Sequence, residues 1–200
     1  MKIFGKYETD GIEITDLSLK QTISLKPINV PHSHGRHAKK PFAKQKINIV
    51  ERLANKLMRG GTGEKTGGKV IRTGGKMQGK KIKALRLVEN AFDIIAKQTN
   101  ENPIQVLIKA LQNSAPREDV TRVALGGVSY QVATDISGTR RLDLALRNIT
   151  LAAIMGSFNK NKALDIALAN EILSTAKGDL HSSYAMRKRD EMERMARSAR

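Results

Sequence analysis

Apolar residues recur at three- and four-residue steps along most of the chain after residue 45, which is typical of helices that bury one face. Asn102–Pro103 indicates a helix start, because Asn caps free N–H groups and Pro loses no bond there. Gly178 indicates a helix end. The predicted helices span about residues 46–58, 80–98, 102–115, 139–157, 160–177 and 181–198.

The stripes also predict which side chains point inward. Ile82 and Ile95 belong to the buried face of the helix at 80–98, and Met195 belongs to that of the last helix. Basic residues fall outside the stripes of the helices at 46–58 and 139–157, so we expect them to project from the bundle. They are Lys46, Arg52, Lys56, Arg59, Arg140, Arg141 and Arg147.

Residues 120–125 and 128–134 are rich in β-prone side chains and flank Gly126–Gly127. Two glycines between such runs predict a tight hairpin, because both can take positive φ. A lone ribbon is marginal in water, so it must lean on the helices or reach a partner. The predicted fold is mainly α: a single bundle of about six helices with a protruding two-stranded β-hairpin and a basic N-terminal extension.

The remaining segments show no clear period. Residues 1–45 are interpreted as an N-terminal extension, in which 31–45 combines Pro, Gly, His and basic residues in an arm that becomes ordered on binding. The bundle then occupies 46–200, with the hairpin at about 119–135 and a Gly-rich basic insertion at 60–79. That insertion is either a phosphate-contacting loop or a flexible connection.

The charge changes this picture most. Lys and Arg total 36 against 19 Asp and Glu, a net charge of +17, which indicates a polyanionic partner. Residues 31–90 alone carry 16 basic and 3 acidic residues, a net charge of +13. The chain has no apolar run long enough to span a bilayer, no signal-peptide pattern and no Cys, so we expect a cytoplasmic protein with no membrane partner. Aromatics make up only 4%, which argues against a base-stacking platform.

Catalytic and metal-binding patterns are weak, and we expect neither an enzyme nor a cofactor. Gly63, Gly68 and Lys69 resemble a phosphate-binding loop, but Val70 stands where Ser or Thr must bind magnesium. The histidines of the arm lie among cations and lack a nearby acid or Cys, so RNA stacking or donation suits them better than metal. They are His32, His34 and His37.

Three functions remain open on these residues. The first is an RNA-binding protein whose cations neutralise phosphates, the second is a DNA-binding architectural protein suggested by charge alone, and the third is a nucleotide hydrolase using the Gly-rich loop. The RNA hypothesis assigns contacts mainly to residues 31–90, including His37, Arg52, Lys56, Arg59 and Lys83.

Longer stretches resemble the universal small-subunit ribosomal protein seven family in its archaeal and eukaryotic branch. They are PHSHGRHAKKPF at 31–42, NIVERLANKLMR at 48–59, residues 79–132, TRRLDLALRNI at 139–149 and SSYAMRKRDEMERMA at 182–196. The insertion at 60–79 is longer than the short turn usual in the family. The hairpin carries only Arg122, where bacterial relatives have more Arg.

The resemblance implies a structural constituent of the 30S subunit that binds the 3′ major domain of 16S rRNA and nucleates assembly of the head. It also implies a hairpin near the exit-site tRNA and the mRNA exit channel, and neighbours such as small-subunit proteins nine and eleven. The implied rRNA contacts are Arg36, Lys39, Lys40, Lys44, Lys46, Lys80, Lys81, Arg140, Arg141, Arg147, Arg187, Lys188 and Arg189, and the implied hairpin tip is Leu125, Gly126, Gly127 and Val128.

Overall fold

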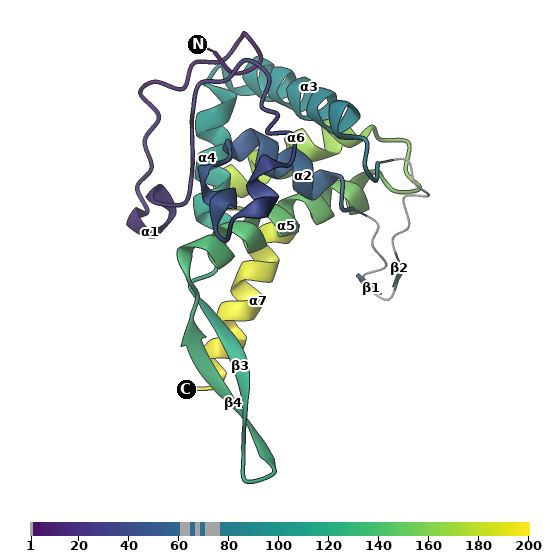
Figure 1. Cartoon of the computed structure of the whole chain (residues 1–200). Helices are drawn as coiled ribbons and strands as arrows, with labels where there is room; N and C mark the ends of the chain where they lie inside the picture. The colour runs from purple at the N-terminus through teal and green to yellow at the C-terminus, as the bar shows by residue number, and fades with distance from the viewer. Residues whose placement is uncertain (1, 61–64, 67–68, 71–76) are drawn as a thin grey trace.

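The computed structural model describes all residues except 1, 61–64, 67–68 and 71–76 (Figure 1). The six predicted helices and the hairpin occur in the predicted order, and the mainly α fold with one long hairpin is confirmed. The short elements α1, η1, η2, β1 and β2 were not predicted. The elements are α1 Leu17–Lys20, 3-10 turns η1 Arg36–Lys39 and η2 Ala43–Lys46, α2 Ile49–Leu57, β1 Lys65–Thr66, β2 Lys69–Val70, α3 Lys81–Thr99, α4 Pro103–Ser114, β3 Glu118–Leu125, β4 Val128–Asp135, α5 Gly138–Ser157, α6 Leu164–Lys177 and α7 Tyr184–Ser198.

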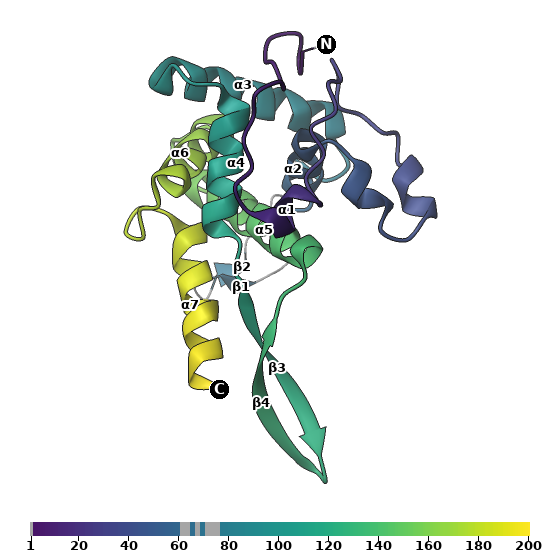
Figure 2. The same ribbon diagram turned by 90° about the vertical axis from the view of Figure 1, so that its left-hand side faces the viewer.

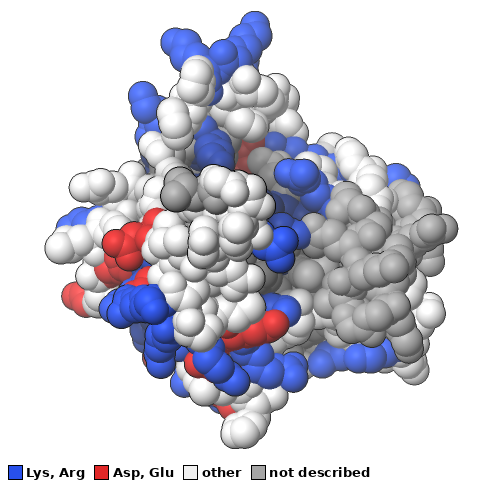
Figure 3. Space-filling view, turned by 90° about the horizontal axis from the view of Figure 1, so that it is seen from below, with Lys and Arg blue, Asp and Glu red and all other residues white. Residues whose placement is uncertain are grey.

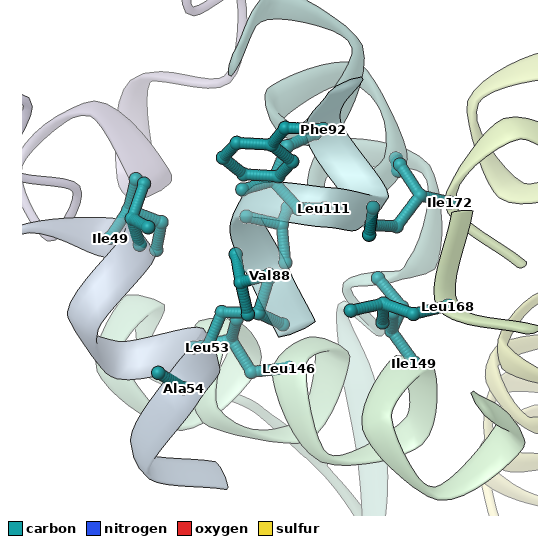
Figure 4. Close-up of a cluster of buried hydrophobic side chains, with 14 of the residues drawn as sticks. Ile49, Leu53, Ala54, Val88, Phe92, Leu111, Leu146, Ile149, Leu168 and Ile172 are labelled. Carbon is teal, nitrogen blue, oxygen red and sulfur yellow. The ribbon is translucent and has the colours of Figure 1, made fainter. Parts of the chain in front are cut away.

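The apolar stripes of α2 to α6 meet in one core (Figure 4). Phe92 of α3, Leu111 of α4 and Leu168 of α6 are each 0% exposed. Burying side chains of this size is the main favourable term in folding, worth about 1.5–3 kcal/mol each. Since the core holds mostly aliphatic residues with a single large ring, its shape depends on close packing between helices rather than on aromatic stacking.

Local signals fix the helix ends. The Asn102 side chain accepts from the Ile104 N–H at 3.1 Å and Pro103 opens α4, as the sequence predicts. Asn48 caps α2 in the same way through the Val50 N–H at 2.9 Å, so that helix starts three residues later than expected. Gly178 closes α6 with a φ of 76°.

The hairpin extends well beyond the bundle in both views (Figures 1 and 2). Its eight-residue strands pair in register from Glu118 opposite Asp135 to Leu125 opposite Val128. Gly126 and Gly127 have φ values of 58° and 83°, the geometry predicted for this turn. The hairpin's base lies beside α7, where the Arg117 N–H donates to Glu193 at 3.1 Å and Arg200 pairs with Glu118.

The N-terminal segment packs on the bundle rather than standing apart from it. Ile3 and Leu19 are fully buried, and the rings of Phe4 and Tyr7 meet Phe92 edge-on at 6.3 and 6.1 Å. Figure 2 shows this segment running along α4 to reach α1 beside α5. The N-terminal segment is therefore a strap that covers part of the core.

Some inward and outward assignments were wrong. Ile82 is 65% exposed because the first turn of α3 has no neighbour over that face in the described residues, and Met195 is 48% exposed. Ala185, Met186 and Ala196 form the buried side of α7 instead. No helix of the described part of the chain is long and apolar enough to cross a membrane.

The hairpin tip gives the first testable prediction. A Cβ at Gly127 would meet nothing within 4 Å, but its φ of 83° is costly for any L side chain. We expect Gly127→Val to destabilise the turn by about 1–2 kcal/mol. Amide hydrogen exchange should quicken in β3 and β4, while the thermal unfolding of the helices measured by circular dichroism stays unchanged.

Ser129→Val is the matched control, because Ser129 lies two residues away in extended strand, where a β-branched side chain is favoured. If the whole helical bundle unfolded cooperatively in Gly127→Val but not in Ser129→Val, the bundle would depend on the hairpin, and the prediction would be wrong.

Candidate nucleic-acid interface

Glu51 ties the basic arm to the bundle. Its side chain, on the first turn of α2, is 3% exposed and accepts from the Ser33 N–H at 2.9 Å and the Ser33 hydroxyl at 2.6 Å. Lys81, at the start of α3, forms an ion pair with the same carboxylate. Burial would raise the pKa of Glu51, but the Lys81 and Ser33 hydrogen bonds outweigh it, and the pKa is lowered. One buried anion thus joins three segments.

Beyond Ser33 the arm turns outward, where it lies to the right of the bundle in Figure 2. Its turns η1 and η2 contain no buried residue. Four cations of the arm are exposed and have no acidic partner within 4 Å in the described residues; they are Arg36, Lys39, Lys40 and Lys46. His37 is half-buried, with Nδ1 3.1 Å from the Ser33 hydroxyl. The arm therefore presents four free positive charges on a segment anchored at its start.

The far end of the arm is held by Asp143 of α5. Lys44 pairs with this carboxylate, Arg52 approaches it at 3.1 Å and Lys56 at 3.8 Å. Burial would raise the pKa of Asp143, but the Lys44 hydrogen bond and the charges of Lys56 and Arg52 outweigh it, and the pKa is lowered. Three cations share one anion, so the cluster keeps a net positive charge.

The pKa of Lys56 reflects the positive charge of this cluster. Its pKa is lowered, first by burial and then by the positive charges of Arg59, Lys44 and Arg52, against the opposing pull of Asp143. A cation held in a positive environment gains from an added anion. Arg59 is exposed three residues further along the chain. This patch could therefore hold a phosphate group.

The turn before α3 adds two more free cations. Lys80 and Lys83 are exposed and have no acidic partner in the part of the chain that the structure describes, whereas Lys81 is engaged with Glu51. Arg86 lies one turn beyond Lys83 on the same helix and is also exposed. Sequence reasoning missed Arg86, although its i+3 spacing from Lys83 was a signal for it.

Arg52 and Arg141 do not project from the bundle, and that expectation was wrong. Arg52 is 5% exposed and also donates to the Thr22 carbonyl at 3.1 Å. Arg141 is 7% exposed, pairs with Asp16 at 2.7 Å and donates to the Pro116 carbonyl at 3.1 Å. Both guanidiniums therefore hold the N-terminal strap on the bundle through buried contacts.

The other predicted contacts on α5 and α7 are mostly engaged. Arg140 is exposed but pairs with Asp119 of the hairpin at 3.0 Å. Lys188 pairs with Glu191 at 2.6 Å, and Arg189 donates to the Asn113 carbonyl at 2.6 Å. Arg147 is exposed. Arg187 is exposed and donates a long hydrogen bond to the carbonyl of Ser183, at 3.4 Å.

The hairpin tip carries little charge, and the Leu125 side chain lies outside the described residues. Arg122 is exposed. The opposite face of the hairpin is apolar and exposed to solvent. There Val128, Tyr130 and Val132 are each between 43% and 55% exposed. Figure 3, which looks up at the hairpin from below, shows Lys and Arg gathered around a mostly uncharged centre.

The described residues show no metal-binding group of three or more His, Cys, Asp or Glu. His32 and His34 lie against each other, with ring centroids 4.1 Å apart. Gly63 and Gly68 of the phosphate-loop candidate lie outside the described residues. Lys69 lies opposite Thr66 in a short β1–β2 ribbon, which forms part of the insertion.

Comparison with known proteins finds similarity to ribosomal proteins. A family model described as ribosomal protein S7p/S5e matches residues 19–200. Small ribosomal subunit protein uS7 of Methanococcus maripaludis strain C7 is 45% identical over 200 residues, which cover 100% of this chain and 99% of that protein. The protein of the same name from Methanothermobacter thermautotrophicus is 45% identical over 197 residues, or 98% of each chain.

The anchoring of the arm predicts a pH-dependent effect. We expect Glu51→Gln to lower the free energy of unfolding by about 1–3 kcal/mol at neutral pH, because Lys81 loses its counter-charge in a nearly buried position. A carboxyl with a lowered folded-state pKa adds stability above its unfolded pKa of about 4.3, and that stability disappears as pH falls through the folded pKa. The difference between the proteins should therefore vanish in acid.

Urea unfolding at several pH values measures this difference, and limited proteolysis should show faster cleavage within 33–46 in Glu51→Gln. Glu101→Gln is the control, since Glu101 pairs with Lys109 at 3.2 Å on the surface and such pairs contribute about 0–1 kcal/mol. Equal unfolding energies for the Glu51 variant and the parent at neutral pH would refute the anchor.

Proposed function

Because this chain belongs to the ribosomal protein S7p/S5e family, we propose that its free cations bind the 3′ major domain of 16S rRNA and nucleate assembly of the small-subunit head. The chain is a structural protein of the ribosome that partners rRNA, and it is not an enzyme. Its place is the small subunit of the cytoplasmic ribosome.

The observation that carries the proposal is a set of exposed cations without acidic partners among the described residues. Many of the chain's other Lys and Arg neutralise a carboxylate within the protein, whereas these side chains keep their full charge for an outside anion. Among the rRNA contacts predicted from the sequence, the members of this set are Arg36, Lys39, Lys40, Lys46, Arg59, Lys80, Lys83 and Arg187.

The arm and the α2–α3 junction supply seven of these eight cations from elements that pack on one another. Glu51 and Asp143 hold the two ends of the arm, so the cations between them are presented at fixed places rather than on a free tail. Phosphate contacts of this kind set register and orientation but read no sequence. Selectivity would then come from the shape of a folded RNA and its 2′-hydroxyls.

Cations that already pair with a carboxylate of the protein are also proposed to contact RNA. Lys44, Lys56 and Lys81 border the free set and share Asp143 or Glu51, so an RNA phosphate could add to those networks. Arg52 and Arg141 are better explained as structural residues that connect segments within the protein, because each is less than a tenth exposed. The proposal for contact by Arg140, Arg147, Lys188 and Arg189 rests on the resemblance. For His37 it rests on its place among the cations of the arm, where a histidine suits RNA contact.

The hairpin is proposed to lie near the exit-site tRNA and the mRNA exit channel, with small-subunit proteins such as nine and eleven as neighbours. Its length and exposure support a reach beyond the bundle (Figure 1). The apolar face of Val128, Tyr130 and Val132 suits a neighbouring protein, and Arg122 suits a nucleic acid. We also propose that 1–45 is an N-terminal extension whose basic arm at 31–45 binds RNA, and that 46–200 is the helical bundle that carries the hairpin and the Gly-rich insertion.

Removing free cations should change the salt dependence of RNA binding. For the double variant Lys39→Gln/Lys40→Gln, the slope of log affinity against log salt should become shallower by about 1 for each lost phosphate contact. Binding of the full chain to a transcript of the 3′ major domain, measured across a salt series, gives the slope. Unchanged affinity and slope would contradict the arm's role.

Lys97→Gln is the control, because Lys97 is also exposed but lies at the far end of α3, and residues 91–135 carry 4 basic and 5 acidic residues, a net charge of −1. Duplex DNA of random sequence separates RNA binding from the architectural alternative, which predicts equal affinity at physiological salt. Sedimentation with nucleoid material instead of 30S particles would also favour that alternative.

Shortening the hairpin separates its role from that of the bundle. We expect replacement of 121–132 by a two-residue turn to leave the helical core and the affinity for the rRNA transcript unchanged, because that span contributes no residue to the described core. Reconstituted subunits should still form their heads but retain deacylated tRNA less well. Full tRNA retention would remove the proposed tRNA contact, and lost rRNA binding would mean that the hairpin, not the arm, dominates.

A further inference from the structure

We propose that Phe42, the residue before η2 in the basic arm, stacks on an unpaired base of the RNA that the arm binds. This inference rests on the proposed function and adds a residue that charge alone does not indicate. Phe42 is 72% exposed, which makes it the most exposed aromatic residue that the structure describes. A single exposed apolar side chain is common and needs no partner by itself, so the inference depends on the backbone and the charges around the ring.

The backbone at Phe42 has an unusual conformation. Phe42 has φ 57° and ψ 1°, a left-handed conformation that is uncommon for any residue but Gly, Asn or Asp. It precedes η2, where its carbonyl accepts the Gln45 N–H at 3.0 Å, while the Lys40 carbonyl accepts the Ala43 N–H at 3.3 Å. A bulky side chain kept at positive φ in a turn fits the pattern of unfavourable local geometry retained at binding sites.

The surroundings of the ring select a nucleic acid base as its partner. Lys39, Lys40 and Lys46 are exposed, within four residues of Phe42, and have no acidic partner in the described chain. Phosphates bound by these cations would bring the attached bases to the ring, and every base offers a π-face. Tyr130 is the contrasting case, because it is exposed among Val side chains on the hairpin, where an apolar protein neighbour fits better.

A single ring is enough for this role. The low aromatic content argues against a platform that stacks successive bases of a single strand. Folded RNA, however, exposes individual unstacked bases in loops and bulges, and proteins commonly cover these with one aromatic side chain. Phe42 would thus supply one base contact to a segment that otherwise contacts phosphates.

The chain contains no Trp, so Phe42→Trp creates a single fluorescent reporter at the proposed contact. Stacking on a base should quench its emission when the full chain binds the 3′ major domain transcript. Phe158→Trp is the matched control, because Phe158 is 37% exposed at the end of α5, away from the arm. Its emission should change little. Unquenched emission of the Phe42→Trp protein in the bound complex would overturn the proposal.

Affinity distinguishes stacking from charge and from general apolar contact. We expect Phe42→Ala to bind the transcript about ten-fold more weakly with the same salt slope, since a base contact but no phosphate contact is lost. Phe42→Trp should keep the parent affinity, and Phe42→Leu should not restore it. Full rescue by Leu would show an apolar contact without stacking and would overturn the inference.

The same measurements separate this inference from the proposed function. If the parent chain does not bind the transcript, the RNA-binding proposal itself fails. If the parent binds and Phe42→Ala binds equally well, only the stacking inference fails. Emission of the Phe42→Trp protein that changes in reconstituted subunits but not with RNA alone would assign the ring to a neighbouring protein and overturn stacking. Circular dichroism checks that each variant is folded, which the exposure of Phe42 leads us to expect.

Discussion

The structure depends on buried or half-buried carboxylates that each hold two or three segments together. Glu51 joins the arm, α2 and α3, and Asp143 joins η2, α2 and α5. Asp16 joins the N-terminal strap to α5 through Arg141. Residues 31–90 carry a net charge of +13, so their cations would repel one another more strongly if the anions lay elsewhere on the surface. Placed at these junctions, a few anions fix the positions of many cations.

This arrangement divides the basic residues into two groups with different physical roles. Arg52 and Arg141 are buried with their counter-charges, and removing either partner would leave an unpaired charge in a poorly solvated place. Arg36, Lys40 and Lys83 are exposed and keep their charge for a partner. The apolar core supplies the rigidity that keeps both groups in place, since its close-packed helices deform little.

Patterns that are local in sequence predicted the structure well. The hairpin follows from two glycines between β-prone runs, and α4 follows from its Asn cap and Pro. The identity of the buried Arg residues could not be predicted this way, because Arg52 meets its anion 91 residues further along and Arg141 meets Asp16 across 125 residues. Ile82 was misplaced for a related reason: periodicity marks a stripe along a whole helix, but neighbouring elements decide which turns are covered.

The candidate site could also be predicted only in part from the sequence. Charge density pointed to the same region of the chain, but only the geometry separates the free cations from those that pair with Glu51 or Asp143. The exposure of Phe42 has no sequence signal at all, because an aromatic residue between a Pro and an Ala gives no sign of its surroundings.

The arm illustrates how an anchored segment differs from a free basic tail in its binding energetics. Sequence composition favoured a segment that becomes ordered only on binding, which would cost about 1–2 kcal/mol of backbone entropy for each residue fixed. Ser33 and Lys44 tie both ends of the arm to buried or half-buried carboxylates before any partner arrives. Part of that entropy is therefore lost on folding rather than on binding, which leaves more of the phosphate attraction as affinity. An internal carboxylate in a basic protein can thus strengthen the binding of a polyanion.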